Sequence, residues 1–266
     1  MKNITSKDNK ILKHTKKLAS SSYRRKLSEF IAEGERLCTE ALSCNKAQLS
    51  YAIATEEFLA ANSDFQKKLD DSRISVYTVS EKLFESVSQT DTPQGVLLAI
   101  KIPSEQTADF TDVTRILILD GISEPGNMGT IIRTADAFGF STTILCNNCV
   151  DIYNPKVVRA TMGGIFRTKF ININNISDVM STIKIAKTEG FQVLATSLEN
   201  SVDITSVKFG IKCAIIIGNE ANGISDELLA LSDMKIKIPM SDGAESLNAA
   251  IAAGIAMFKA MEDTIK

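Results

Sequence analysis

Tryptophan is absent from this chain of 266 residues, and histidine occurs only once. Hydrolases of the Ser-His-Asp or Cys-His type need a histidine beside the nucleophile. The only candidate, His14, lies in a basic N-terminal arm that we expect to be mobile, as chain ends often are. Hydrolase chemistry of this type is therefore disfavoured, and any proton abstraction is expected to use another group.

Cysteine is also scarce, and its five residues do not make a disulfide framework in a chain of this length. An odd count favours free thiols. Cys146 and Cys149 form one C-x-x-C pair, which could supply half of a zinc site. Zinc needs about four ligands, and the one histidine lies in the arm. We therefore expect incidental or buried thiols and no metal site.

No apolar run approaches the length of about 20 residues that a membrane-spanning helix needs. The first residues are polar and charged, without the apolar segment of a secretory signal. These features predict a cytoplasmic protein that does not act on a membrane.

Net charge is small, at -2, but the charge is unevenly distributed. Residues 1–26 contain nine basic residues against Asp8 alone. A basic arm on an acidic remainder indicates contact with the phosphates of a nucleic acid. A solvated N-terminal helix remains an alternative on charge alone.

The order of expected elements predicts two α/β domains. Residues 27–102 alternate short β-rich runs with helical patterns, as in a small α/β sandwich. The polar stretch 102–112 has no periodicity and is interpreted as a linker. We place the boundary near residue 108, which gives domains of 1–108 and 109–266.

Apolar strands separated by helices continue from residue 113 and predict a parallel, doubly wound sheet. Expected strands cover 115–121, 141–146, 169–173, 191–197, 212–218 and 235–240. Expected helices begin near residues 127, 156, 176, 225 and 246. Sheets of this kind bind ligands at the carboxyl ends of their strands.

Three motifs follow predicted strands: EPGNMGTIIRTADAFG from residue 124, IIIGNEANGIS from 215 and IPMSDGAESLNAAIA from 238. Their glycines allow a backbone to approach a ligand closely. Each motif taken alone also fits a turn followed by a helix N-cap, at Asn127, Ser225 or Ser246. The three together favour a ligand site. They match neither a Walker A loop nor the G-x-G-x-x-G pattern of dinucleotide enzymes.

In order and spacing the three motifs resemble those of the SpoU/TrmH family of RNA ribose 2′-O-methyltransferases, in the SPOUT superfamily. The similarity covers 113–260. The earlier segments EFIAEGERLCTEAL and TDTPQGVLLAI are similar to the N-terminal substrate-binding domain of two-domain members, which resembles a ribosomal RNA-binding protein.

The resemblance implies a fold that periodicity does not predict, a parallel sheet whose C-terminal segment forms a deep trefoil knot. It also implies S-adenosylmethionine as cofactor and a homodimer formed through the C-terminal domain. The implied cofactor-binding residues are Thr196, Gly218, Asn219, Gly223, Ile238, Met240 and Leu247. The implied catalytic residues are Asn127, Arg133, Glu220, Ser246 and Asn248.

The predicted activity is methyl transfer from S-adenosylmethionine to a ribose 2′-hydroxyl of structured RNA, with ribosomal RNA favoured. A tRNA methyltransferase and a catalytically silent RNA-binding protein of this fold are the alternatives. In-line methyl transfer needs alignment and exclusion of water but no metal.

Two roles remain open for Arg133, that of general base and that of a clamp for phosphate and hydroxyl. A helix ion pair with Asp136 or Glu124 is its structural alternative. Ile238 and Leu247 are equally compatible with plain core positions. The last helix is apolar around most of its circumference, which predicts burial on more than one side. That burial could come from a second subunit or from the same chain.

Overall fold

The computed structural model describes residues 1–104, 108–241 and 246–265. The chain forms two compact units. Unit 1 is Met1–Ser104 with Asp151–Phe166, and unit 2 is Glu105–Val150 with Arg167–Lys266. Within the described ranges no helix combines the length and the apolar character that crossing a bilayer requires.

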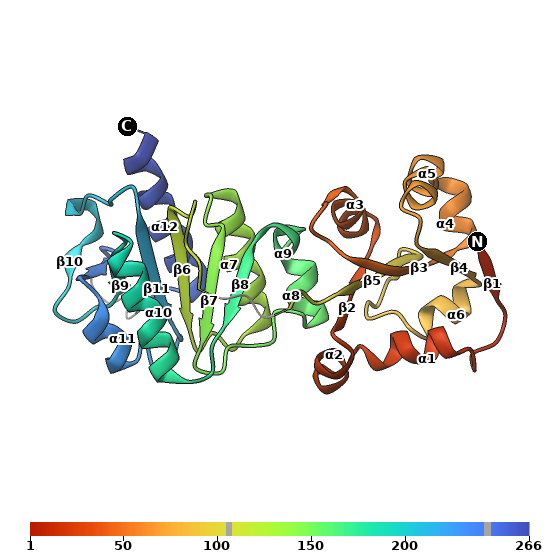
Figure 1. The fold of residues 1–266 in the computed structure, drawn as a ribbon, viewed down its shortest axis with the longest axis horizontal. Helices are drawn as coiled ribbons and strands as arrows, with labels where there is room; N and C mark the ends of the chain where they lie inside the picture. Colours follow the sequence, from red (N-terminus) through yellow and green to blue (C-terminus); the bar gives the residue numbers. More distant parts are fainter. Residues whose placement is uncertain (105–107, 242–245, 266) are drawn as a thin grey trace. The chain divides into compact units, whose positions relative to one another are not determined.

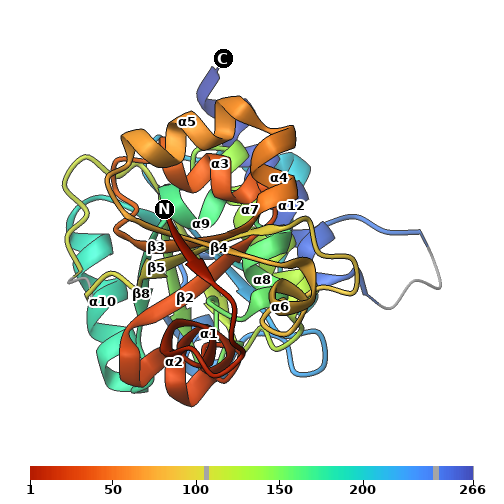
Figure 2. The ribbon, with the colours of Figure 1, turned by 90° about the vertical axis from the view of Figure 1, so that its right-hand side faces the viewer.

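Unit 1 contains a five-stranded sheet in the order β1-β4-β3-β5-β2. Strand β5 runs antiparallel to β2 and β3, and the other pairs are parallel. Helices α3, α4 and α5 cover one face, while α1, α2 and α6 cover the other (Figures 1 and 2). The predicted α/β sandwich is confirmed. The strands are β1 (Lys2–Ile4), β2 (Glu29–Glu33), β3 (Leu49–Thr55), β4 (Ser75–Val79) and β5 (Val96–Lys101). The helices are α1 (Lys10–Lys17), α2 (Ser21–Leu27), α3 (Glu35–Ser43), α4 (Glu56–Ala61), α5 (Ser63–Asp71) and α6 (Glu81–Glu85).

The basic N-terminal arm is folded, so the expectation of a mobile arm was wrong. Strand β1 pairs with β4, and Leu12 and Leu18 are buried in the core under the sheet. The apolar residues of α1 lie on one face and its lysines on the other, as in an ordinary amphipathic helix. The density of positive charge concealed this pattern in the sequence.

His14 helps to fix the arm to the sheet. Its Nε2 lies 2.5 Å from Oε2 of Glu29, which is buried in β2. Burial raises the pKa of Glu29, but hydrogen bonds from Lys101, His14 and Ser50 outweigh it and leave the pKa below its usual value. The single histidine therefore has a structural partner within unit 1.

Residues 151–166, which the sequence analysis counted in the second domain, pack with unit 1. They include α8 (Pro155–Ala160) and most of α9 (Gly164–Arg167). The buried Arg24 binds Asp151 at 2.6 Å, and the ring of Phe30 lies 4.8 Å from Tyr153 and 6.4 Å from Phe166. The limits 1–108 and 109–266 remain a prediction for domains that fold independently.

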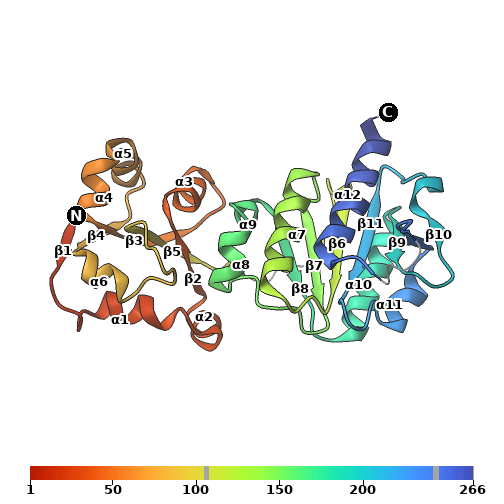
Figure 3. The same cartoon turned by 180° about the vertical axis from the view of Figure 1, so that it is seen from behind.

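Unit 2 contains a seven-stranded sheet in the order β10-β12-β9-β11-β6-β7-β8, and its paired strands are parallel. Helices α10 and α11 cover one face (Figure 1), and α7 and α12 cover the other (Figure 3). The predicted parallel sheet is confirmed. Its strands are β6 (Arg115–Asp120), β7 (Thr142–Cys146), β8 (Lys169–Asn172), β9 (Gln192–Thr196), β10 (Val202–Asp203), β11 (Cys213–Gly218) and β12 (Met234–Lys237). Its helices are α7 (Pro125–Ala137), α10 (Ile176–Thr188), α11 (Asp226–Leu231) and α12 (Ala249–Ile265), with a 3-10 turn at Ile204–Ser206.

The central strands of unit 2 are buried along most of their length, which explains their continuous apolar sequences. The two-residue strand β10 was missed because it is too short to show a pattern. Residues 242–245 of the third motif lie outside the described residues. The knot depends on how this connection is threaded and remains a prediction.

Candidate active site

The three motifs begin at one edge of the unit 2 sheet. Strands β6 and β11 are parallel neighbours, and the last residue of β6, Asp120, lies opposite the last residue of β11, Gly218. Strand β12, which precedes motif three, pairs with β9 so that Ile236 lies opposite Thr196. Because all these strands are parallel, the loops that follow them emerge at the same edge.

Motif one opens helix α7, and the alternative of an N-cap at Asn127 was wrong. Glu124 is the N-cap residue, and its carboxylate accepts a hydrogen bond from the Asn127 N–H at 2.6 Å. Asn127 therefore lies in the first turn of the helix and not at the N-cap. This position leaves the Asn127 side chain available for the other motifs.

One hydrogen-bonded trio joins the three motifs. The Asn127 side-chain amide donates to Oε1 of Glu220, in motif two. The Asn248 amide, from motif three, donates to Oδ1 of Asn127 at 3.0 Å. Three of the five predicted catalytic residues are thus in contact although 121 positions separate Asn127 from Asn248.

Asn248 also determines where the last helix starts. Its Oδ1 accepts the Ala250 N–H at 2.9 Å, and α12 begins at Ala249. The helix therefore begins three residues after the expected start at Ser246, and Asn248 caps it in place of the alternative, Ser246. The side-chain oxygen of Asn248 thus caps the helix, while its side-chain nitrogen donates to Asn127.

The motif-two loop is a tight turn that also holds motif one. Asn219 and Gly223 exchange backbone hydrogen bonds of 3.0 and 2.9 Å. The Asn219 side chain donates to the Gly121 carbonyl at 2.8 Å and accepts from the Ala221 N–H at 2.8 Å. A Cβ at Gly218 would collide with the backbone of Gly223 and Ile224. The turn is thus closed so tightly that only glycine fits at its base.

The residues predicted to bind the cofactor fit a nucleoside. Ile238, Met240 and Leu247 are each half-buried, so they offer apolar surface without being sealed in the core. The Thr196 hydroxyl donates to the Ile216 carbonyl at 3.1 Å, at the same strand edge. Half-exposed apolar side chains suit the face of an adenine ring, and backbone groups of a tight, glycine-containing turn suit its edge.

Arg133 and Ser246 are both exposed. Neither has a hydrogen-bond or ion-pair partner within the part of the chain that the structure describes. The alternative pairing of Arg133 was wrong, because Asp136 binds Arg167 at 2.7 Å and Glu124 caps α7. The Arg133 guanidinium therefore extends from α7 with its donors free for a ligand.

Both thiols of the C-x-x-C pair are hydrogen-bonded to the backbone. The thiols of Cys146 and Cys149 both donate to the Leu119 carbonyl, at 3.1 and 3.3 Å. Burial raises the pKa of both thiols, so they stay protonated at neutral pH. All five cysteines are free, and the described ranges hold no cluster of three or more His, Cys, Asp or Glu fit for a metal.

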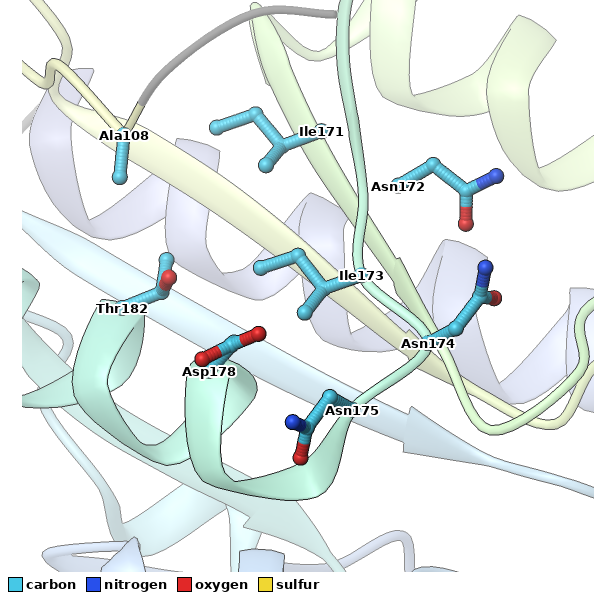
Figure 4. Close-up of a pocket in the computed structure, with 8 residues that line it drawn as sticks. All are labelled: Ala108, Ile171, Asn172, Ile173, Asn174, Asn175, Asp178 and Thr182. Atoms are coloured by element: carbon cyan, nitrogen blue, oxygen red, sulfur yellow. The ribbon is translucent and has the colours of Figure 1, made fainter.

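A pocket of about 390 Å³ lies elsewhere in unit 2, between β8 and α10 (Figure 4). Ile171 and Ile173 line it from the strand side, and Asp178 and Thr182 line it from α10. None of the predicted site residues contributes to it. Of the residues in the trio, Asn127 is half-buried, and Glu220 and Asn248 are exposed.

Asp120 is a further buried residue at this site, at the end of β6 and four positions before motif one, and it was missed in the sequence. The available signal was an acidic residue at the end of an otherwise apolar strand. Such a residue is not needed for sheet packing and must have partners if it is buried.

Two family models together match most of the chain. Residues 114–258 match the model of the SpoU rRNA methylase family, and residues 9–98 match the MRM3-like substrate binding domain. The chain belongs to the SpoU rRNA methylase family. Both halves of the resemblance seen in the sequence are thereby confirmed.

Individual relatives cover nearly the whole chain. The 23S rRNA (guanosine(2553)-2′-O)-methyltransferase RlmP of Bacillus subtilis is 33% identical over 97% of this chain and 98% of its own. The crystal structure of an AdoMet-bound rRNA methyltransferase from Sinorhizobium meliloti has 30% identity and a TM-score of 0.86, and covers 98% of this chain and 97% of its own. The 23S rRNA (uridine(2479)-2′-O)-methyltransferase of Streptomyces viridochromogenes is 29% identical over 69% of this chain and 65% of its own.

The predicted activity, RNA ribose 2′-O-methylation with S-adenosylmethionine as cofactor, is confirmed for this family member. The individual residue roles remain predictions.

The two motif-two glycines give a matched test of the cofactor site. In Gly218→Ala the added Cβ meets backbone that cannot move without opening the turn, so we expect loss of cofactor binding by more than about 100-fold. In Gly223→Ala nothing lies within 4 Å of the added Cβ, and only the φ of +68° is unfavourable. That strain costs about 1 kcal/mol, which predicts a loss of about tenfold or less. Calorimetric titration of S-adenosylmethionine measures both, and equal losses would contradict the assignment.

Proposed function

We propose that this SpoU methylase methylates a ribose 2′-hydroxyl of 23S ribosomal RNA in the cytoplasm, with the five predicted catalytic residues at its active site. The observation that carries the residue assignment is the Asn127–Glu220–Asn248 trio, which joins all three motifs. Two of the relatives described above are named as 23S rRNA methyltransferases, which supports the choice of RNA. A silent RNA-binding protein would have no need of this polar trio.

When bound, S-adenosylmethionine supplies an electrophilic methyl group on a sulfonium. The task of the chain is to align the ribose hydroxyl, exclude water and accept a proton. Glu220 is the member of the trio that can take a proton, at the carboxylate that Asn127 orients. Asn248 donates to the side-chain oxygen of Asn127 and so fixes the orientation of that amide. The side-chain nitrogen of Asn127 then points toward the Glu220 carboxylate.

Arg133 is assigned the part of an RNA clamp. A guanidinium stays protonated in proteins, which makes it a poor base. Its fork of donors suits a phosphate, and its charge stabilises the developing alkoxide. The exposed position of Arg133 and its lack of a partner in the described ranges support this role.

Helices α1 and α2 supply the second RNA contact in the proposal. Their exposed cations include Lys16, Lys17, Arg25 and Lys26. Lys17 lies 5.3 Å from the ring centre of Tyr23, which is itself partly exposed. The one acidic residue of the arm, Asp8, already pairs with Lys13. A positive helical face with an aromatic ring suits an RNA backbone.

A homodimer through unit 2 completes the proposal. Helix α12 packs one side on its own subunit, where Ala253, Ala256 and Met257 are buried. Its other side exposes 54% of Ile251 and 50% of Phe258. An apolar stripe of this kind on a helix suits a second subunit. The catalytic trio lies at the start of the same helix.

Arg133→Ala should reduce methyl transfer by more than about 100-fold, because the variant has no guanidinium to stabilise the transition state. Cofactor affinity should stay within a few-fold, since motif one faces RNA in this proposal. Tritium transfer to 23S rRNA and calorimetry measure the two effects. Arg167→Ala is the control, because it removes an arginine that contacts the same helix through Asp136. Parallel loss of transfer and cofactor binding in Arg133→Ala would contradict the division of roles.

Replacing Lys16 and Lys17 by glutamine should weaken RNA binding and flatten its salt dependence. The slope of log affinity against log salt should fall by about 0.7 to 0.9 for each phosphate that the variant no longer neutralises. The control replaces Lys67 and Lys68, an exposed pair on α5 across the same sheet, and should leave the slope unchanged. Equal slopes for the two variants would remove α1 from the RNA-binding surface.

The protein should sediment as a species of twice the 28.9 kDa chain mass at low micromolar concentration. The double variant Ile251→Glu/Phe258→Glu should sediment as a monomer, because it places two charges in the apolar stripe. Ile185→Glu serves as control, since Ile185 is 42% exposed and lies on α10, which covers the opposite face of the sheet from α12. A fully active wild-type species of monomer mass would refute the dimer.

A further inference from the structure

Asp120 is a buried carboxylate with both oxygens engaged. Asp120 is only 4% exposed. Oδ2 accepts the Ser225 N–H at 2.7 Å and the Ser225 hydroxyl at 2.8 Å. Oδ1 accepts the Asn147 side-chain amide at 2.5 Å. Three donors offset the cost of removing this charge from water.

These donors come from two other loops at the same sheet edge. Ser225 closes the motif-two segment and occupies the N-cap position of α11. Its hydroxyl makes no cap hydrogen bond to that helix and turns to Asp120. Asn147 follows β7 and has a φ of +51°, a left-handed conformation that side chains seldom adopt. Its amide also lies 3.4 Å from the Ser225 hydroxyl.

The motif-two segment is thus attached to the end of β6 at two points. At its beginning, Asn219 donates to the carbonyl of Gly121. At its end, Ser225 donates twice to Asp120. Between these two points lie Glu220 and Gly223. A loop fixed at both ends by hydrogen bonds has few other conformations available.

We propose that Asp120 is a positioning residue for cofactor binding, which sets the shape of the motif-two loop through Ser225 and Asn147. The inference rests on the proposed cofactor site at that loop. Asp120 does not belong to the Asn127–Glu220–Asn248 trio and is not a catalytic residue. Its replacement should raise the cofactor Kd and KM by a larger factor than it lowers kcat.

The test compares Asp120→Ala with Asp120→Asn by calorimetric titration of S-adenosylmethionine into the full-length protein. Asp120→Ala leaves Ser225 and Asn147 without their acceptor and should raise the cofactor Kd by about tenfold or more. Asp120→Asn should stay within a few-fold of wild type. The side-chain oxygen of the new asparagine still accepts from Ser225. Its nitrogen donates to the Asn147 side-chain oxygen once the Asn147 amide has flipped.

Asp233 provides a control at the opposite end of the strands, directly before β12. Its carboxylate accepts the Val193 N–H at 2.8 Å and pairs with Lys187 at 2.6 Å. Asp233→Ala should lower the melting temperature and leave the cofactor Kd unchanged. A rise in Kd as large as that of Asp120→Ala would overturn the proposal, since it would show a general effect of destabilisation.

Ser225→Ala is the milder variant if Asp120→Ala does not fold, as judged by circular dichroism. It removes one of the two Ser225 hydrogen bonds and should raise the cofactor Kd several-fold. Where both fold, Asp120→Ala/Ser225→Ala should lose less affinity than the two single losses multiplied, because both variants remove the same hydrogen bond. An unchanged Kd in Ser225→Ala, or equal losses in Asp120→Ala and Asp120→Asn, would overturn the proposal. Wild-type protein that binds cofactor but transfers no methyl to 23S rRNA would refute the proposed function alone.

Discussion

The site depends on the in-register pairing of two parallel strands, β6 and β11. Their last residues, Asp120 and Gly218, lie opposite each other, so the loops that follow them start side by side. Both strands are buried along nearly their whole length, and a shift in register would misplace every apolar side chain. Two almost fully buried strands therefore hold the loops that carry motifs one and two.

Hydrogen bonds of modest individual strength shape the loops on this rigid base. Each contributes about 1 kcal/mol net, and those to a carboxylate contribute somewhat more. Asn219 uses both ends of its amide, one within its own turn and one on Gly121. Asn248 does the same between α12 and Asn127. Side-chain amides suit this purpose because each carries a donor and an acceptor on one short side chain.

Unit 1 shows the same division between a buried scaffold and a polar surface. Helix α1 places Leu12 and Leu18 in the core and leaves its lysines in solvent. His14 and Glu29 fix this helix to the sheet, so positive charge is presented on an ordered surface. An ordered cationic face loses less conformational entropy on meeting RNA than a mobile arm would.

The sequence by itself determined the parallel sheet of unit 2, the sandwich of unit 1 and the family, because apolar periodicity and motif spacing are local properties. It did not predict the folded arm, since the lysines of α1 masked the apolar spacing on its other face. As the alternative to a ligand site it offered helix N-caps at Asn127, Ser225 and Ser246, because any Asn or Ser before an apolar run has that local preference. Only Ser225 occupies an N-cap position in the structure. Only the tertiary structure brought Asn127, Glu220 and Asn248 into contact and gave Asp120 its partners. Those contacts span about 90 to 120 residues, and strand order and register decide such distances, which no local pattern encodes.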